Sequence, residues 1–308
     1  MFVVCGEALM DVFAVADTAA GMAMDARIGG SPFNVAVGLA RLGQPVGFFG
    51  ALGSGFLGER LLRALREEGV DTACTPVLDA PTTLSVVGVD GRGVPSYSFY
   101  GAGCADRLLP MAALDRIPAA TRAFNFGSFA MVVEPTASTQ RALVERERQR
   151  SLIAYDPNIR LNVEPDLQRW RDTLRWMADR THLLKVSDED LGLLFPGADV
   201  AQLARGWLQA GVGLVVVTRG GAGAEAWAAG LHLRAAPQRV TVVDTVGAGD
   251  TFQAALLTWL AEQGRLSPAG VRDWNGADLA AALDFAGRAA AITCSRRGAD
   301  LPRRAELR

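Results

Sequence analysis

Three short apolar runs decide the fold predicted for this chain: LIAYDP (152–157), HLLKVS (182–187) and LVVVTRG (214–220). Helix-like segments at 166–178 and 200–210 separate them. Continuous apolar strands that alternate with helices are typical of a parallel sheet covered on both faces. The pattern extends toward the N-terminus through strand-like runs at 2–6, 45–52 and 123–129 and helix-like segments at 34–42, 58–68 and 136–149. We therefore expect one α/β domain over residues 1–308.

Two strand-rich segments interrupt this alternation, one at 11–28 and the other at 82–106. The second contains a turn expected at Asp90-Gly91, between an alternating run and an aromatic run, which is the pattern of a β-hairpin. In an open α/β sheet, ligands bind beyond the carboxyl ends of the strands. The two segments are therefore expected to form a small β-sheet lid over that edge.

The composition excludes several classes of function. With 31 Lys and Arg against 33 Asp and Glu, the net charge is −2, which favours neither nucleic acid nor an anionic membrane surface as a partner. Lys185 is the single lysine and does not follow a glycine, so the P-loop pattern GxxxxGK[ST] is excluded. HExxH and GxSxG are also missing. Phosphate chemistry is thus expected to depend on backbone amides, arginines and a divalent ion.

The N-terminal segment and the cysteines indicate a cytoplasmic protein. MFVVCGEALMDVF has neither a basic start nor a small-residue cleavage site, and no apolar run reaches the ~18 residues that span a bilayer. The cysteines form no CxxC pair and are expected to be reduced thiols. They are Cys5, Cys74, Cys104 and Cys294.

The segment DTVGAGDTFQAALL (244–257) carries the most chemical information. A strand is predicted over 239–244, followed by a turn of small residues and a helix with apolar residues at i, i+4, i+7 and i+8 from Phe252. Small residues at 247–249 let a ligand approach the backbone, and the amides at a helix start favour an anion. The pattern predicts an anion hole for a transferring phosphoryl group.

Polar residues beside these small residues suggest a catalytic base and a sugar site. Asp250, in the first turn of the predicted helix, is placed to accept a proton from an incoming hydroxyl, although a capping aspartate would show the same pattern. GGSPFNVAVGLARLG (29–43) places two glycines before another helix, and Asn34 offers a donor and an acceptor to sugar hydroxyls. A glycine loop with an asparagine cap is the alternative for that segment.

Together, the two segments resemble the two signature patterns of the ribokinase-like (PfkB-type) carbohydrate kinases. The resemblance covers essentially the whole chain. It implies a three-layer α/β/α sandwich with a mostly parallel central sheet and a small β-sheet lid. It also implies a sugar and ATP as small-molecule partners, Mg²⁺ as a cofactor, and K⁺ as a further candidate cofactor.

The resemblance also implies roles for individual residues. Asp250 is the implied base, and the implied anion hole consists of Gly247, Ala248 and Gly249. The implied sugar site consists of Asp11, Gly29, Gly30, Asn34 and Arg160. The residues implied for ATP binding are Asn158, Ser187, Thr218, Arg219, Gly220 and Gly223. Asp190 stands where the family has a residue that organises Mg²⁺ through water, with Asp188 and Glu189 as alternatives, and Asp244 is a candidate for a monovalent cation.

The substrate expected from the resemblance is D-fructose, converted to fructose 6-phosphate. GEALMD (6–11), DPNIR (156–160) and FYGAGCADRLL (99–109) are similar to bacterial fructokinases, although Gly101 stands where an arginine is common. A 2-keto-3-deoxygluconate kinase and a ribokinase are alternatives, and a non-catalytic sugar- or nucleotide-binding regulator is an alternative of another class.

Two further features of the sequence concern partners and cofactors. GSGFLG (53–58) matches the GxGxxG pattern of dinucleotide-binding folds, but no acidic residue follows at the required spacing, so NAD is not expected. The apolar hairpin VFAVADTAAGMAM (12–24) would suit a homodimer formed through the lid.

Overall fold

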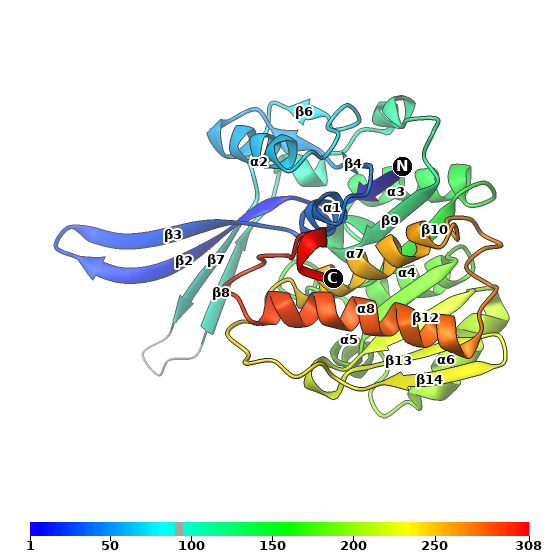
Figure 1. Ribbon diagram of the computed structural model, residues 1–308. Helices are drawn as coiled ribbons and strands as arrows, with labels where there is room; N and C mark the ends of the chain where they lie inside the picture. Colours follow the sequence, from blue (N-terminus) through cyan, green and yellow to red (C-terminus); the bar gives the residue numbers. More distant parts are fainter. Residues whose placement is uncertain (90–94, 308) are drawn as a thin grey trace.

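The computed structural model describes residues 1–89 and 95–307, so the turn predicted at Asp90-Gly91 lies outside the described residues. An eight-stranded sheet in the order β14-β13-β12-β11-β10-β9-β1-β4 forms the centre of the molecule (Figure 1). Its strands are β1 (Phe2–Cys5), β4 (Val46–Phe49), β9 (Ala123–Gly127), β10 (Leu152–Asp156), β11 (Leu183–Ser187), β12 (Leu214–Thr218), β13 (Ala224–Ala228) and β14 (Leu231–Ala235). The six strands from β4 to β12 are parallel, and β13 and β14 add an antiparallel edge.

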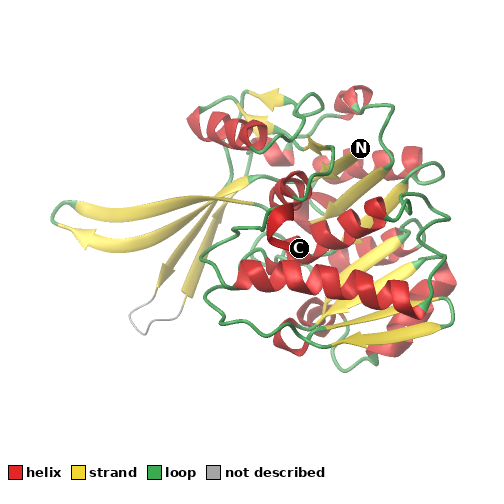
Figure 2. Ribbon diagram, in the orientation of Figure 1, coloured by secondary structure: helices red, strands yellow, loops and turns green. Residues whose placement is uncertain are grey.

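Helices cover both faces of this sheet (Figure 2). Successive strand residues point to opposite faces, so Phe2 and Val4 belong to one hydrophobic core and Val3 and Cys5 to the other. The first core contains residues of α1 (Ser31–Arg41), α2 (Phe56–Glu67), α7 (Ala248–Glu262) and α8 (Gly276–Cys294). The second contains residues of α3 (Thr136–Glu147), α4 (Leu167–Ala178), α5 (Asp188–Leu194) and α6 (Val200–Ala210). The predicted three-layer sandwich is confirmed.

A four-stranded sheet, called the small sheet below, projects from this body (Figure 1). Its order is β3-β2-β7-β8, from β2 (Leu9–Thr18), β3 (Gly21–Gly29), β7 (Leu84–Val89) and β8 (Pro95–Tyr100). Two antiparallel hairpins are joined by parallel pairing of β2 with β7. Because β2 follows β1 and β3 leads into α1, the small sheet joins the body beside the carboxyl end of β1.

Short elements complete the fold. β5 (Leu52–Gly53) and β6 (Val77–Leu78) form a two-stranded sheet. The 3₁₀ helices are η1 (Ala105–Arg107), η2 (Met111–Arg116), η3 (Ser128–Met131), η4 (Gly220–Ala222) and η5 (Arg304–Leu307). Over 1–89 and 95–307, no helix combines the length and the apolar character needed to cross a membrane.

The strand predicted over 239–244 is wrong. Residues 236–247 form an irregular segment, in which Val242 and Val243 are exposed. The amides of Val243 and Asp244 donate to the carbonyl oxygen of Cys294, at the end of α8, and not to a neighbouring strand. The run of valines has the side chains of a strand, but among the described residues no strand pairs with its backbone.

Candidate active site

A cleft of about 1110 Å³ lies where the small sheet, the carboxyl ends of the central strands and the start of α7 meet. Most of the residues assigned to the site from the sequence line it. They are Asp11, Gly30, Asn34, Asn158, Arg160, Ser187, Asp190, Thr218, Gly220, Gly223, Gly247, Ala248, Gly249 and Asp250. Three do not line it: Gly29, Arg219 and Asp244. Sites at the carboxyl edge of an α/β sheet are where this architecture binds ligands.

The carboxylate of Asp250 is held between two helix starts. Ser31 Oγ donates to Asp250 Oδ1 at 2.6 Å, and Asn34 Nδ2 donates to Asp250 Oδ2 at 2.8 Å. Ser31 and Asn34 are one helical turn apart in α1, so one face of that helix presents both donors. Sequence reasoning missed the contribution of Ser31. The contacts fix the orientation of the carboxylate at the wall of the cleft.

Burial raises the pKa of Asp250 above its ordinary value. The hydrogen bonds from Ser31 and Asn34 and the charge of Lys185 act in the opposite direction, and the charge of Asp156 adds to the increase. A carboxylate with a raised pKa accepts a proton more readily than an ordinary aspartate. Asp250 therefore combines a fixed orientation with increased basicity.

The first residues of α7 provide backbone donors next to Asp250. Gly247 adopts the left-handed conformation, with φ of 78°, and caps the helix. The amide of Ala248 donates to Thr245 O at 3.2 Å, whereas within the described chain no backbone acceptor pairs with the amides of Gly247 and Gly249. These unpaired donors and the helix dipole favour an anion.

A second carboxyl group, Glu7, was not singled out from the sequence. It is 1% exposed, and burial raises the pKa of Glu7 to about 8. Its Oε2 has no hydrogen-bond partner among the described residues, and the side chain lines the cleft. The glycines that precede α1 make room for this region. A β-carbon on Gly29 would overlap the carboxylate of Asp11, and one on Gly30 (φ 107°) would lie 2.7 Å from Glu7 O.

A glycine-rich turn and an apolar helix face also line the cleft. Thr218, Gly220 and Gly223 border it where β12 turns into β13, and Leu283 and Ala290 of α8 form an apolar wall. An apolar wall beside a glycine-rich turn suits an aromatic base that carries phosphates.

Asp190 also lines the cleft. Its Oδ1 accepts from the amide of Ile159 at 3.1 Å, next to Asn158, which has a positive φ of 42°. Its own amide donates to Ser187 Oγ at 3.0 Å, which caps α5. Burial and the charge of Asp156 raise the pKa of Asp190.

The single lysine of the chain also lines the cleft. Lys185 is 4% exposed, and its Nζ lies 2.6 Å from Asp156 Oδ2. Burial alone would lower the pKa of Lys185, but the charge of Asp156 and the hydrogen bond to it raise that pKa, so the side chain stays an ammonium. Sequence reasoning left Lys185 without a role because its partner comes from another strand.

Comparisons with known proteins agree with this architecture. The family model described as pfkB family carbohydrate kinase matches residues 1–305. The chain belongs to this family. It is 36% identical, over 260 residues, to a fructokinase from Rhizobium leguminosarum bv. trifolii, a match covering 84% of this chain and 79% of the relative.

Solved structures of two fructokinases are similar to this carbohydrate kinase over nearly the whole chain. The Xylella fastidiosa fructokinase with bound ATP has a TM-score of 0.88 and 27% identity, covering 99% of this chain and 96% of that one. The Vibrio cholerae O395 fructokinase in a form with fructose, ADP and calcium ion bound has a TM-score of 0.80 and 27% identity, covering 99% and 97%.

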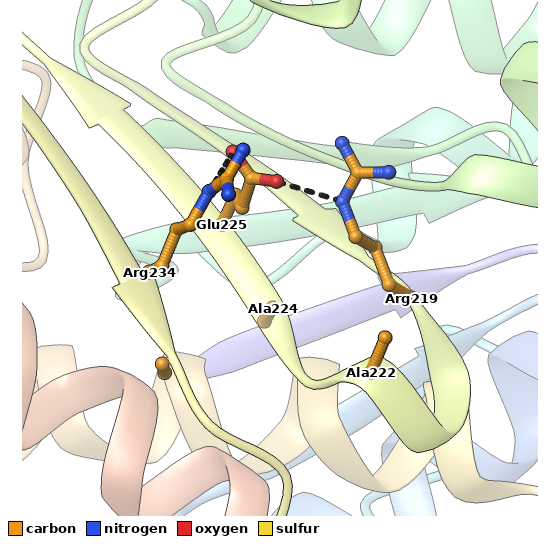
Figure 3. Close-up of a pocket in the computed structure, with 6 residues that line it drawn as sticks. Arg219, Ala222, Ala224, Glu225 and Arg234 are labelled. Atoms are coloured by element: carbon orange, nitrogen blue, oxygen red, sulfur yellow. Dashed lines mark ion pairs between the residues drawn. The ribbon is translucent and has the colours of Figure 1, made fainter.

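Arg219, which the resemblance assigns to ATP binding, directs its side chain to Glu225 and does not line the cleft. Its Nε lies 2.9 Å from Glu225 Oε1, and Arg234 Nε lies 3.2 Å from Glu225 Oε2. Figure 3 shows both arginines around Glu225 in a neighbouring pocket of about 300 Å³. Because Glu225 is buried, its charge needs compensation, and Arg219 is directed there.

The Asp244 side chain stabilises the irregular segment that precedes α7 by accepting two backbone hydrogen bonds. Its Oδ1 accepts from the amide of Val246 at 3.1 Å, and its Oδ2 accepts from the amide of Gly298 at 2.8 Å. Its role with a monovalent cation stays a prediction.

Gly101 stands where an arginine is common in bacterial fructokinases, and the side chain of Arg107 occupies the space beside it. A β-carbon on Gly101 would overlap the guanidinium of Arg107, which lies over the rings of Phe99 and Phe129 at 5.2 and 5.8 Å. Both rings line the cleft. A guanidinium from six residues further along the chain thus lies in the space beside Gly101, behind two rings of the cleft wall.

Proposed function

We propose that this carbohydrate kinase transfers the γ-phosphoryl group of ATP to the 6-hydroxyl of D-fructose. Asp250 carries the proposal, because its carboxylate is fixed by Ser31 and Asn34 beside the Gly247 and Gly249 amides, which have no backbone acceptor among the described residues. The relatives named fructokinase, and the Vibrio cholerae form with fructose and ADP bound, support the choice of substrate.

In the proposed reaction, the sugar binds against Asp11, Gly30 and Asn34. Asp250 takes the proton of the 6-hydroxyl as its oxygen forms a bond to the γ-phosphorus, and the bond from that phosphorus to the bridging oxygen breaks to release ADP. The amides at the start of α7 donate to the oxygens of the transferring group, where negative charge must be stabilised.

We also propose that residues 1–308 work as a single catalytic domain, in which 11–28 and 82–106 act as the lid. The small sheet supplies Asp11 from β2 and Phe99 from β8 to the wall of the cleft. Its closure over a bound sugar would exclude water, which would otherwise compete as the acceptor.

Magnesium is proposed to enter with ATP. In the part of the chain that the structure describes, no three His, Cys, Asp or Glu side chains gather as a metal site. Mg²⁺ is commonly held by substrate phosphates, waters and one or two carboxylates, and the buried Asp190 at the cleft is a suitable hard oxygen ligand. When bound, the ion neutralises charge on the phosphates. Dependence on K⁺ stays a prediction.

The test is a coupled assay of ADP release with fructose, ribose and 2-keto-3-deoxygluconate as acceptors. The highest kcat/KM is expected for fructose. A higher value for either other sugar would correct the substrate and leave the reaction type intact. If no sugar stimulates ATP turnover, the kinase function is refuted, and a non-catalytic sugar- or nucleotide-binding regulator is favoured.

The exposed apolar side chains of the β2–β3 hairpin support a homodimer formed through the lid. Val15, Met22 and Met24 are exposed on it. Light scattering should give twice the monomer mass for the wild type and the monomer mass for a Met22→Glu, Met24→Glu variant. A monomeric wild type would refute the dimer. The cytoplasmic location stays a prediction.

A further inference from the structure

The buried ion pair between Lys185 and Asp156 lies next to the anion hole. A β-carbon placed on Gly249 would lie 3.2 Å from Lys185 Nζ, so the ammonium adjoins a residue whose amide is unpaired. Lys185 and Gly249 both line the cleft. Two other cations on the cleft wall, Arg160 and Arg239, are exposed and screened by water, whereas Lys185 is buried.

The ammonium has unused capacity to donate. It carries three N–H donors, and among the described residues Asp156 Oδ2 is its one hydrogen-bond acceptor. The ion pair fixes the position of Nζ but leaves its other N–H groups without an acceptor among the described residues. A buried charged donor with free N–H groups, at the wall of a cleft and beside a free backbone amide, is suited to an anionic oxygen.

Lys185 also alters the electrostatics for an incoming phosphate. The carboxylates of Asp156, Asp190 and Asp250 all interact with its charge. Without the ammonium, the charges of these three carboxylates, of which Asp190 and Asp250 line the cleft, would be left uncompensated and would repel a strongly anionic donor molecule. The positive charge of Lys185 thus allows the carboxylate of Asp250 and an anion-binding site to lie within one cleft.

We propose that Lys185 is a further catalytic residue, whose ammonium, held in place by Asp156, donates to an oxygen of the transferring phosphoryl group. The proposal rests on the kinase function proposed above. The phosphoryl oxygen would then be held by the Gly247 and Gly249 amides on one side and by Lys185 on the other. The competing interpretation is that Lys185 does no more than neutralise Asp156.

A double variant separates the two interpretations. Lys185→Met alone leaves the Asp156 carboxylate buried without a partner and can unfold the chain. Lys185→Met with Asp156→Asn removes both charges and keeps similar side-chain volumes, so the melting temperature should stay near that of the wild type. Asp156→Asn alone is the matched control, because it keeps the lysine, whose charged form the carboxylates of Asp250 and Asp190 continue to favour. It should retain kcat within about tenfold, as expected for the loss of a supporting contact.

Turnover is measured with the sugar that the wild type phosphorylates best. The double variant is expected to lose roughly 10²–10³-fold in kcat, the effect of removing one donor from an oxyanion-type site. A kcat within threefold of that of the Asp156→Asn control would overturn the proposal, because charge neutralisation would then explain the lysine fully.

Nucleotide binding without sugar gives a readout that does not depend on the substrate. Calorimetry with ADP and with a non-hydrolysable ATP analogue should show that the double variant loses about tenfold more affinity for the analogue. That is about 1.4 kcal/mol for a contact to the γ-phosphoryl group. Equal losses for both nucleotides would overturn the proposal. If no sugar is phosphorylated but the unequal loss persists, the kinase function fails while the phosphate contact of Lys185 stands.

Discussion

Replacement of Asp250 by asparagine tests the base without disturbing its surroundings. Asparagine has the same shape, and if its amide nitrogen faces Ser31, the Ser31 hydroxyl can rotate to accept while Asn34 Nδ2 still donates to the amide oxygen. Both contacts at 2.6 and 2.8 Å can therefore be rebuilt around a neutral group. The variant loses the proton acceptor and the charge, and little else.

The expected loss in kcat is about 10²–10⁴-fold, the usual contribution of a general base, or about 2.7–5.4 kcal/mol of transition-state stabilisation. The KM for the sugar should change little, because Asp11, Gly30 and Asn34 are retained. Steady-state kinetics from the ADP-release assay measure both quantities. Turnover within threefold of wild type would refute Asp250 as the base.

The fold of the variant is expected to be at least as stable as that of the wild type at pH 7. Burial raises the pKa of Asp250 in the folded state, so the unfolded chain ionises first as pH rises from about 3.8. The free energy of unfolding of the wild type therefore decreases as pH rises from about 3.8 to the pKa of Asp250 in the folded state. The asparagine variant has no group that titrates there and does not show this decrease. Thermal melts at pH 3 and pH 7 check the sign, with Asp172→Asn, an exposed carboxylate on α4, as the control.

Two further substitutions have defined outcomes. Gly30→Ala should lower the free energy of unfolding by about 1–3 kcal/mol in urea titrations, because residue 30 has φ of 107° and the added β-carbon would crowd Glu7 O at 2.7 Å; an unchanged midpoint would contradict this. Glu7→Gln should gain stability over the wild type progressively between pH 4.5 and 8, because burial raises the pKa of Glu7 to about 8 and the unfolded chain ionises first. Melts of both proteins across that interval measure the gain, and parallel pH profiles would show that Glu7 is not held protonated.

Features that depend on nearby residues could be predicted from the sequence. The strand–helix alternation, the helix start at 247–249 and the placement of Asp250 in its first turn each follow from side chains a few positions apart. The prediction of a strand over 239–244 was wrong because it depended on residues that are distant in the sequence. A run of valines favours extended backbone, but a strand also needs a partner, and pairing is decided elsewhere in the chain.

The contacts that complete the site could not be predicted in this way. Ser31 reaches Asp250 across 219 positions, and Lys185 meets Asp156 from a neighbouring strand. Arg107 lies against Gly101 because the backbone turns there and leaves space beside a residue without a side chain. No local pattern encodes such pairs.

By itself, the sequence determined a parallel α/β chain with a helix that starts in small residues and carries a carboxylate in its first turn, since these depend on side-chain periodicity and local backbone preferences. Only the tertiary structure decided which charges lie near that carboxylate, that the Arg219 side chain turns to Glu225, and that the single lysine is buried beside Gly249. The physical reason is that burial and charge pairing depend on distances in space, and folding alone brings distant strands and helices to the same edge of the sheet.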